Sequence, residues 1–189
     1  MFRKLMFASL FALIFADVLF GQVPTSYLGP QLGWQKASDA DEAKLMVGGA
    51  FRVKLSPSFG LEAAVNYRKE DYDNGSVSVT SWPVMVTALI YPIPIIYGAI
   101  GAGWYNTSID YSSNVLLFSN ENNQTEQNFG WHFGGGVEIP LGMSMSSPGA
   151  ILTGDIRYVF LNYDFQKLPG SPGLNSNFIY MTVGLLFNL

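Results

Sequence analysis

The sequence predicts an all-β fold, an eight-stranded antiparallel up-and-down transmembrane β-barrel. Three observations support this prediction. Apolar residues recur at every second position along much of the chain, which indicates strands. The connections between these segments alternate between short and long. The 189 residues are 49% hydrophobic and only 13% charged, which is about half the charged fraction of an ordinary soluble domain.

The first 21 residues are expected to form an export signal that precedes the barrel. Arg3 and Lys4 are followed by the apolar run 5–16, which is too short to span a bilayer. An uncleaved anchor is the alternative, but Asp17 interrupts the run. We therefore predict a signal peptide at 1–21, cleaved after Gly21, and a barrel domain at 22–189.

Alternation is clearest in three segments. Apolar residues or glycine occupy the odd positions from 45 to 55, from 129 to 139 and from 179 to 189. Side chains of a strand alternate between two faces, so each segment has one apolar face. The same criterion, applied along the chain, predicts strands at 25–36, 44–55, 59–69, 76–91, 94–107, 127–141, 150–163 and 177–189.

The expected connections differ at the two ends of the sheet. Those after the second, fourth and sixth strands are short, at 56–58, 92–93 and 142–149. Those after the other strands are longer and polar, at 37–43, 70–75, 108–126 and 164–176, and they hold most of the acidic residues. Transmembrane barrels have short turns at one end and long loops at the other.

The segment 83–103 is apolar enough to suggest a membrane helix as an alternative. Pro83, Pro92 and Pro94 would break such a helix, and the β-branched residues favour strands. We predict a hairpin that turns at residues 92–94. Because a closed barrel has no edge strand for a proline, we expect a β-bulge at Pro83, and Pro30 raises the same question.

Charged residues within the predicted strands lie on the face opposite the apolar one. A charge that faced lipid near the midplane would cost about 2–4 kcal/mol, so these side chains are expected to point into the lumen. Ion pairs that fill the lumen are the main interpretation, and a narrow polar path for ions or small solutes is the alternative. Glycines at 98, 101, 103, 134, 135 and 136 would make room for large neighbours. The predicted lumen network consists of Arg52, Glu62, Arg68, Glu138, Asp155 and Arg157.

Several aromatic residues lie near the ends of the predicted strands. Tyr91 and Phe187 lie toward the short turns. Aromatic girdles mark both bilayer interfaces of transmembrane barrels, although ordinary strand aromatics are the alternative. Toward the long loops, the predicted interface aromatics are Trp34, Trp104, Tyr105 and Trp131.

Other function classes find little support in the composition. The chain has no cysteine, which excludes disulfides and thiolate metal sites, and no metal or cofactor is predicted. A net charge of -4 argues against nucleic-acid binding. The sole histidine, His132, is six residues from Glu138 on the same face, or about 20 Å along a strand. That carboxylate cannot orient it, so we predict no enzyme, with a lipid A-modifying enzyme as a remaining alternative.

The predicted strands contain, in order, the segments 27–33 (YLGPQLG), 82–86 (WPVMV), 97–105 (YGAIGAGWY), 134–138 (GGGVE) and 155–160 (DIRYVF). With these segments in this order, the chain resembles the OmpX/OmpW-like outer-membrane β-barrel domain family of Gram-negative bacteria. The resemblance implies an outer-membrane location, contact with outer-membrane lipids and lipopolysaccharide, insertion by the barrel-assembly machinery and a monomer. It also implies a structural or surface role, in envelope integrity, adhesion or resistance, through the long outer loops. A narrow channel or transporter for ions or small hydrophobic molecules is the alternative.

Overall fold

A computed structural model of the chain describes residues 24–37, 43–72, 77–111, 123–142, 149–161 and 177–189. The predicted signal peptide and most of the residues expected in the long connections lie outside these ranges, and so do Asp39, Asp41 and Glu42. Among the described residues, no helix has the length and apolar character needed to cross a membrane.

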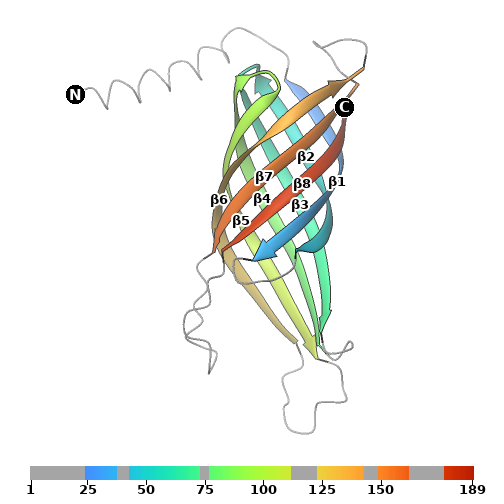
Figure 1. Cartoon of the computed structure of the whole chain (residues 1–189), viewed down its shortest axis with the longest axis vertical. Coiled ribbons are helices and arrows are strands. Elements are labelled where there is room, and N and C mark those ends of the chain that lie inside the picture. Colours follow the sequence, from blue (N-terminus) through green and yellow to red (C-terminus); the bar gives the residue numbers. More distant parts are fainter. Residues whose placement is uncertain (1–23, 38–42, 73–76, 112–122, 143–148, 162–176) are drawn as a thin grey trace, which may run out of the picture.

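Eight antiparallel strands close into a barrel, in which each strand pairs with its neighbours in sequence and β8 pairs with β1 (Figure 1). This confirms the predicted eight-stranded up-and-down barrel. The strands are β1 (Thr25–Ala37), β2 (Lys44–Ser56), β3 (Phe59–Tyr72), β4 (Val77–Ile93), β5 (Ile96–Tyr111), β6 (Asn123–Leu141), β7 (Ala150–Leu161) and β8 (Phe178–Asn188).

The central strands are longer than predicted. β5 and β6 continue to pair as far as Asp110 and Asn123, within the segment expected to be a connection. As a result, β3 to β6 extend well beyond β1, β7 and β8 at the end opposite the C-terminus (Figure 1). Outward residues of this extension, such as Asn106 and Ser108, are polar. Without an apolar face there, periodicity in the sequence could not reveal the strand.

The apolar segment 83–103 is a hairpin, as predicted, but it turns later than expected. The turn residues are Pro94 and Ile95, and the register shift lies between Ile90 and Ile93. The β-bulge predicted at Pro83 is absent: the ladder with β3 skips two pairs there and resumes in the same register. The ladder between β1 and β8 skips Pro30 in the same way. Each proline therefore interrupts the backbone pairing with only one of its two neighbouring strands, because it lacks the N–H that would face that strand.

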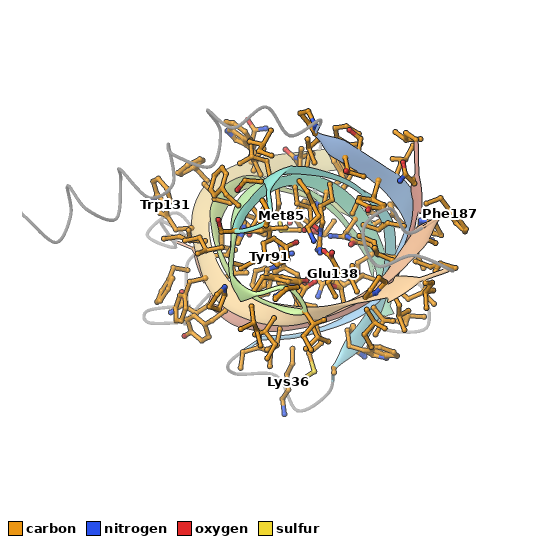
Figure 2. The ribbon with its side chains drawn as sticks, turned by 90° about the horizontal axis from the view of Figure 1, so that it is seen from above. Lys36, Met85, Tyr91, Trp131, Glu138 and Phe187 are labelled. Atoms are coloured by element: carbon orange, nitrogen blue, oxygen red, sulfur yellow. The ribbon has the colours of Figure 1, made fainter. Side chains whose placement is uncertain are left out.

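Side chains alternate between the lumen and the outer surface. Met85, Tyr91 and Glu138 point inward, whereas Lys36, Trp131 and Phe187 point outward (Figure 2). The outer face is therefore apolar although it does not pack against protein. A transmembrane barrel can thus contain many dispersed hydrophobic residues without a large protein core. Buried apolar side chains fill much of the lumen: Tyr27, Met46, Ala50, Ala64, Met85, Tyr105, Ile151, Val159, Leu161, Phe178, Tyr180 and Leu186.

Candidate functional site

The charged cluster in the lumen begins with a pair held directly by the strand register. Arg52 of β2 and Glu62 of β3 are cross-strand partners on the inward face. The carboxylate of Glu62 accepts hydrogen bonds from Arg52 Nε at 2.9 Å and from Arg52 Nη2 at 2.5 Å. Such a two-point contact between a guanidinium and a carboxylate fixes the orientation of both groups.

A second arginine reaches the same carboxylate from a strand distant in sequence. Arg157 of β7 donates from Nη2 to Glu62 Oε1 at 2.5 Å. Its Nε lies 2.7 Å from Asp155 Oδ1, which makes an ion pair without the alignment of a hydrogen bond. Glu62 therefore connects β2, β3 and β7 across the barrel.

A second acidic residue connects the other side of Arg52. Arg52 Nη1 donates to Glu138 Oε2 at 2.9 Å, and Tyr91 donates its hydroxyl to the same oxygen at 2.8 Å. Lys54 Nζ lies 2.6 Å from Glu138 Oε1 and stacks over the Tyr91 ring, 4.4 Å from its centroid. Lys54 was not among the residues predicted for the lumen, although its position two residues from Arg52 places it on the same face.

Tyrosine hydroxyls bridge the charged groups. Arg52 donates from Nη2 to the Tyr97 hydroxyl at 3.1 Å, and that hydroxyl donates to Asp155 Oδ2 at 3.0 Å. We call the lumen cluster the set Arg52, Lys54, Glu62, Tyr91, Tyr97, Glu138, Asp155 and Arg157, which come from β2 to β7. Its three cations balance its three anions.

Arg68, the sixth residue of the predicted network, lies apart from the lumen cluster. It faces inward on β3, opposite Ser81, and is half-buried. It is six residues from Glu62, or about 20 Å along the strand. Shared inward orientation therefore did not imply a shared level in the lumen.

His132 lies in the wall of the lumen, with only 1% of its surface exposed. Its Nε2 is 2.9 Å from Thr87 Oγ1, which also accepts a hydrogen bond from Arg157 Nη1 at 2.8 Å. Within the described residues, Nδ1 has no hydrogen-bond partner. A catalytic histidine needs an orienting group at that nitrogen and access to substrate, and the described structure provides neither.

The aromatic residues expected at the bilayer interface divide between the two faces. Trp34, Trp104 and Trp131 face outward and are 46%, 48% and 62% exposed. Their location at the interface itself remains a prediction. Tyr105, predicted beside them, instead points into the lumen and is only 3% exposed. Neighbouring strand residues face opposite sides, so Trp104 and Tyr105 cannot both face lipid. For Tyr91 the expectation was also wrong, since it belongs to the lumen cluster.

The glycines expected to make room for large neighbours divide in the same way. A Cβ at Gly136 would lie 2.6 Å from the Tyr97 hydroxyl and 2.5 Å from Asp155 Cβ, so the lumen cluster occupies the space that this glycine leaves. Gly101, Gly103 and Gly134 likewise have side chains of lumen residues within 3.0 Å of a Cβ position. The expectation fails for glycines 98 and 135, where no side chain lies close, because both face outward.

Comparison with known proteins gives the same architecture. The family model described as outer membrane protein beta-barrel domain matches residues 5–187. A major outer membrane protein from Thermus thermophilus is similar in structure, with a TM-score of 0.60, 14% identity and coverage of 89% of this chain and 100% of that one. Neisserial surface protein A gives a TM-score of 0.51 and 12% identity, over 88% of this chain and 97% of that one. No curated protein sequence gives a significant match.

The family match covers almost the entire chain, and its description agrees with the closed barrel, the inward charges and the apolar outer face. The protein is located in the outer membrane and is surrounded by its lipids. The chain belongs to the outer membrane protein β-barrel domain family.

Proposed function

We propose that the protein is a non-enzymatic, non-conducting barrel with a structural or surface role in the outer membrane, exerted through its extended strands and long outer loops. This role is in envelope integrity, in adhesion or in resistance to toxic agents. The observation that carries the proposal is the inaccessibility to water of Arg52, Glu62 and Arg157, the centre of the lumen cluster.

A water-filled pore would wet the charged groups that line it. Arg52 and Arg157 are instead 0% and 2% exposed, and Glu62 is 3% exposed. Their contacts join strands from opposite sides of the lumen, so the side chains cross the space that ions would have to use. An eight-stranded barrel is just wide enough to be filled by side chains in this way. This arrangement argues against the narrow channel as the main function.

The extension of β3 to β6 supports a role at the cell surface. Short turns of outer-membrane barrels face the periplasm and long loops face outward, so the extension lies on the external side. Asn106 and Gln127 are linked there by a 2.9 Å hydrogen bond on its outer face, where an apolar surface would be needed for lipid. A polar sheet that continues past the aromatic residues presents a surface to partners or to the lipopolysaccharide head groups.

Catalysis is not part of the proposal. The side chain of His132 is buried against Thr87, whose hydroxyl also accepts a hydrogen bond from Arg157. A lipid A substrate would have to reach it through the filled lumen or through the strand ladder. A His132→Ala variant is expected to leave lipid A unchanged, and altered lipid A in cells that express only the unsubstituted protein would contradict this expectation.

Two measurements test the proposal. The purified full chain in planar bilayers is expected to give no steady conductance, and vesicles that contain it should take up no small solute. In cells, a variant with residues 112–122 replaced by a short glycine-serine turn should reproduce the adhesion or detergent sensitivity of cells that lack the protein. A barrel that conducts, or a shortened variant that retains the full phenotype, would overturn the proposal. Heat-dependent gel migration verifies that the shortened variant folds.

A further inference from the structure

Above the lumen cluster, on the side of the long loops, lie buried polar atoms that have no hydrogen-bond partner among the described residues. They are the Nδ1 of His132, the Nδ2 of Asn66 and the hydroxyl groups of Tyr105 and Tyr180. These four residues come from four different strands and are at most 3% exposed. Such groups are rare in folded proteins, because a buried donor or acceptor without a partner loses its hydration and gains nothing in return.

The heights of these groups in the barrel follow from the stagger of the strands. Arg52 pairs with Tyr27 of β1, but the ladder of cross-strand partners that leaves Arg52 in the other direction returns to β1 at Ala37. On the way, this ladder passes Glu62, Thr87, Gly101, His132, Val159 and Phe178. One circuit of the barrel therefore climbs along β1 from residue 27 to residue 37, toward the long loops. The share of each strand in this climb is slightly more than one residue.

Three of the four groups consequently lie at one height. His132 is three strands beyond Glu62 on this ladder, and so about four residues higher. Asn66 is four residues above Glu62 on β3 itself. Phe178 is five strands beyond Glu62, or about six residues higher, and Tyr180 is two residues below it on β8. Because all three side chains point inward, they border the same layer of the lumen.

The fourth group, the Tyr105 hydroxyl, belongs to a ring that borders this layer from above. The Tyr105 ring packs edge-on against Phe178, with the centroids 5.6 Å apart, and the Phe178 ring is 6.4 Å from that of Tyr180. The Arg157 guanidinium lies 5.7 Å from the centroid of the Tyr180 ring. The layer therefore lies between aromatic rings above and the lumen cluster below.

The hydrogen bonds of Thr87 determine which nitrogen of His132 carries the proton. Thr87 Oγ1 accepts a hydrogen bond from Arg157 Nη1 at 2.8 Å and lies 2.9 Å from His132 Nε2. Within the described residues the Thr87 hydroxyl contacts no other acceptor, so it donates its proton to Nε2. An imidazole that accepts at one nitrogen carries its proton on the other, and Nδ1 of His132 is therefore a donor.

The ligand that these groups require is a small acceptor without charge. Asn66 Oδ1 accepts a hydrogen bond from Gln31 Nε2 at 2.7 Å, so that Nδ2 of Asn66, like Nδ1 of His132, is left as a donor. A cation would find only donors and hydroxyl groups here. An anion would add a charge beside a cluster whose cations and anions already balance, and an uncompensated charge is costly where bulk water is excluded. Water accepts and donates at once, and it bridges polar groups that are too far apart to bond directly.

We propose that the lumen contains a binding site for ordered water directly above the lumen cluster, with His132, Asn66, Tyr105 and Tyr180 as its ligands. The site is internal, since each of these residues is at most 3% exposed, and the water it binds forms no continuous path through the barrel. The sole histidine of the chain thus holds internal water and has no part in catalysis.

Because the chain has one histidine, nuclear magnetic resonance can observe the site without any substitution. The full chain, labelled with ¹⁵N at histidine alone and folded into phospholipid nanodiscs, gives the spectrum of a single imidazole. We expect nitrogen chemical shifts that place the proton on Nδ1, and transfer of magnetisation from water to that proton. A proton on Nε2, or an Nδ1 proton that receives no magnetisation from water, would overturn the proposal. So would a signal that shifts when chloride is replaced by sulfate, since the ligand would then be an anion.

The Tyr180→Phe variant tests the site independently, through the sign of its effect on stability in urea. Loss of a hydroxyl that binds water should raise the unfolding equilibrium constant by about twofold to tenfold. A hydroxyl without any partner would give the opposite sign, because phenylalanine then removes only a buried polar group; an unchanged or lower constant would overturn the proposal. Tyr67→Phe is the control, since Tyr67 is on the outer face and 47% exposed, and it should leave the constant unchanged. Heat-dependent gel migration verifies folding, and Tyr105→Phe, with the same expected result, replaces a Tyr180→Phe variant that does not fold.

Discussion

Replacement of Glu62 by glutamine is the most direct test of the lumen cluster. The substitution preserves the size of the side chain and removes its charge. Glu62 accepts three charge-assisted hydrogen bonds, two from Arg52 at 2.9 and 2.5 Å and one from Arg157 at 2.5 Å. In the Glu62→Gln variant, an amide N–H₂ would point at one of the two guanidinium groups, and the cluster would carry an uncompensated positive charge.

The expected loss follows from the burial of these groups. Removing one member of a buried ion pair typically costs about 3–5 kcal/mol, because the remaining charge stays buried without its partner. The side chains of Arg52, Glu62 and Arg157 are all at most 2% exposed, so water cannot replace the carboxylate. The unfolding equilibrium constant should therefore rise by about two to four orders of magnitude, at about 1.4 kcal/mol for each factor of ten.

Glu138→Gln is the matched comparison. Glu138 also contacts two cations, but the side chain of Lys54 is 22% exposed and can turn to water when its partner is lost. We expect a loss of about 1–3 kcal/mol, as for hydrogen bonds to charged groups, and hence a smaller effect than at Glu62.

Urea titration of the barrel in vesicles, followed by tryptophan fluorescence, measures both losses. A double variant, Glu62→Gln with Arg157→Gln, restores charge balance and should be less destabilised than the sum of its single variants. A smaller loss of stability for Glu62→Gln than for Glu138→Gln would contradict this account of the lumen cluster. So would single losses that simply add in the double variant.

Three further predictions follow from the same geometry. Gly136→Ala should lower the free energy of unfolding by about 1–3 kcal/mol through overpacking. At Gly98 a Cβ would meet nothing within 4 Å, so Gly98→Ala should be neutral or should stabilise the barrel by about 0.4–1 kcal/mol. Equal urea midpoints for the two variants would contradict this. Tyr91→Phe loses a 2.8 Å hydrogen bond to a carboxylate and should lower the free energy of unfolding by about 1.5–3 kcal/mol, with an unchanged circular dichroism spectrum. Ile100→Lys places a charge on the lipid face and should cost about 2–4 kcal/mol. Ser108→Lys places the same charge on the polar extension of that face and should cost at most about 1 kcal/mol. Similar losses for the two variants in vesicles would mean that the extension lies within the bilayer.

Alternation was sufficient to predict the barrel because one face of each strand is lipid-exposed. In β8 the inward positions from Phe178 to Leu186 and the outward positions from Ile179 to Phe187 differ sharply in exposure. The same signal ended where the apolar outer face ends. Past Trp104 the outward residues of β5 are polar, so the sequence predicted a loop although the backbone ladder continues to Asp110.

The cluster was only partly predictable for a different reason. Whether a side chain points inward depends on its odd or even position along the strand, so the charged residues could be assigned to the lumen one by one. Their partners depend on strand tilt and stagger, which bring Arg52 against Glu138, 86 residues away, and place Arg68 at another level. Tyr91 was assigned to the wrong face because both faces of β4 are largely apolar from residue 84 to residue 91, so alternation there separates them only weakly.

The sequence by itself determined the fold class, the number of strands, the outer-membrane family and the inward placement of the strand charges. These properties depend on local periodicity and on the cost of a charge in lipid, and both can be recognised within the sequence of a single strand. Only the tertiary structure decided which charges meet, that Tyr105 and Tyr91 fill the lumen, and that β3 to β6 extend beyond the other strands. Those features depend on how the closed barrel staggers its strands around a common axis, and no single segment of the chain contains that information.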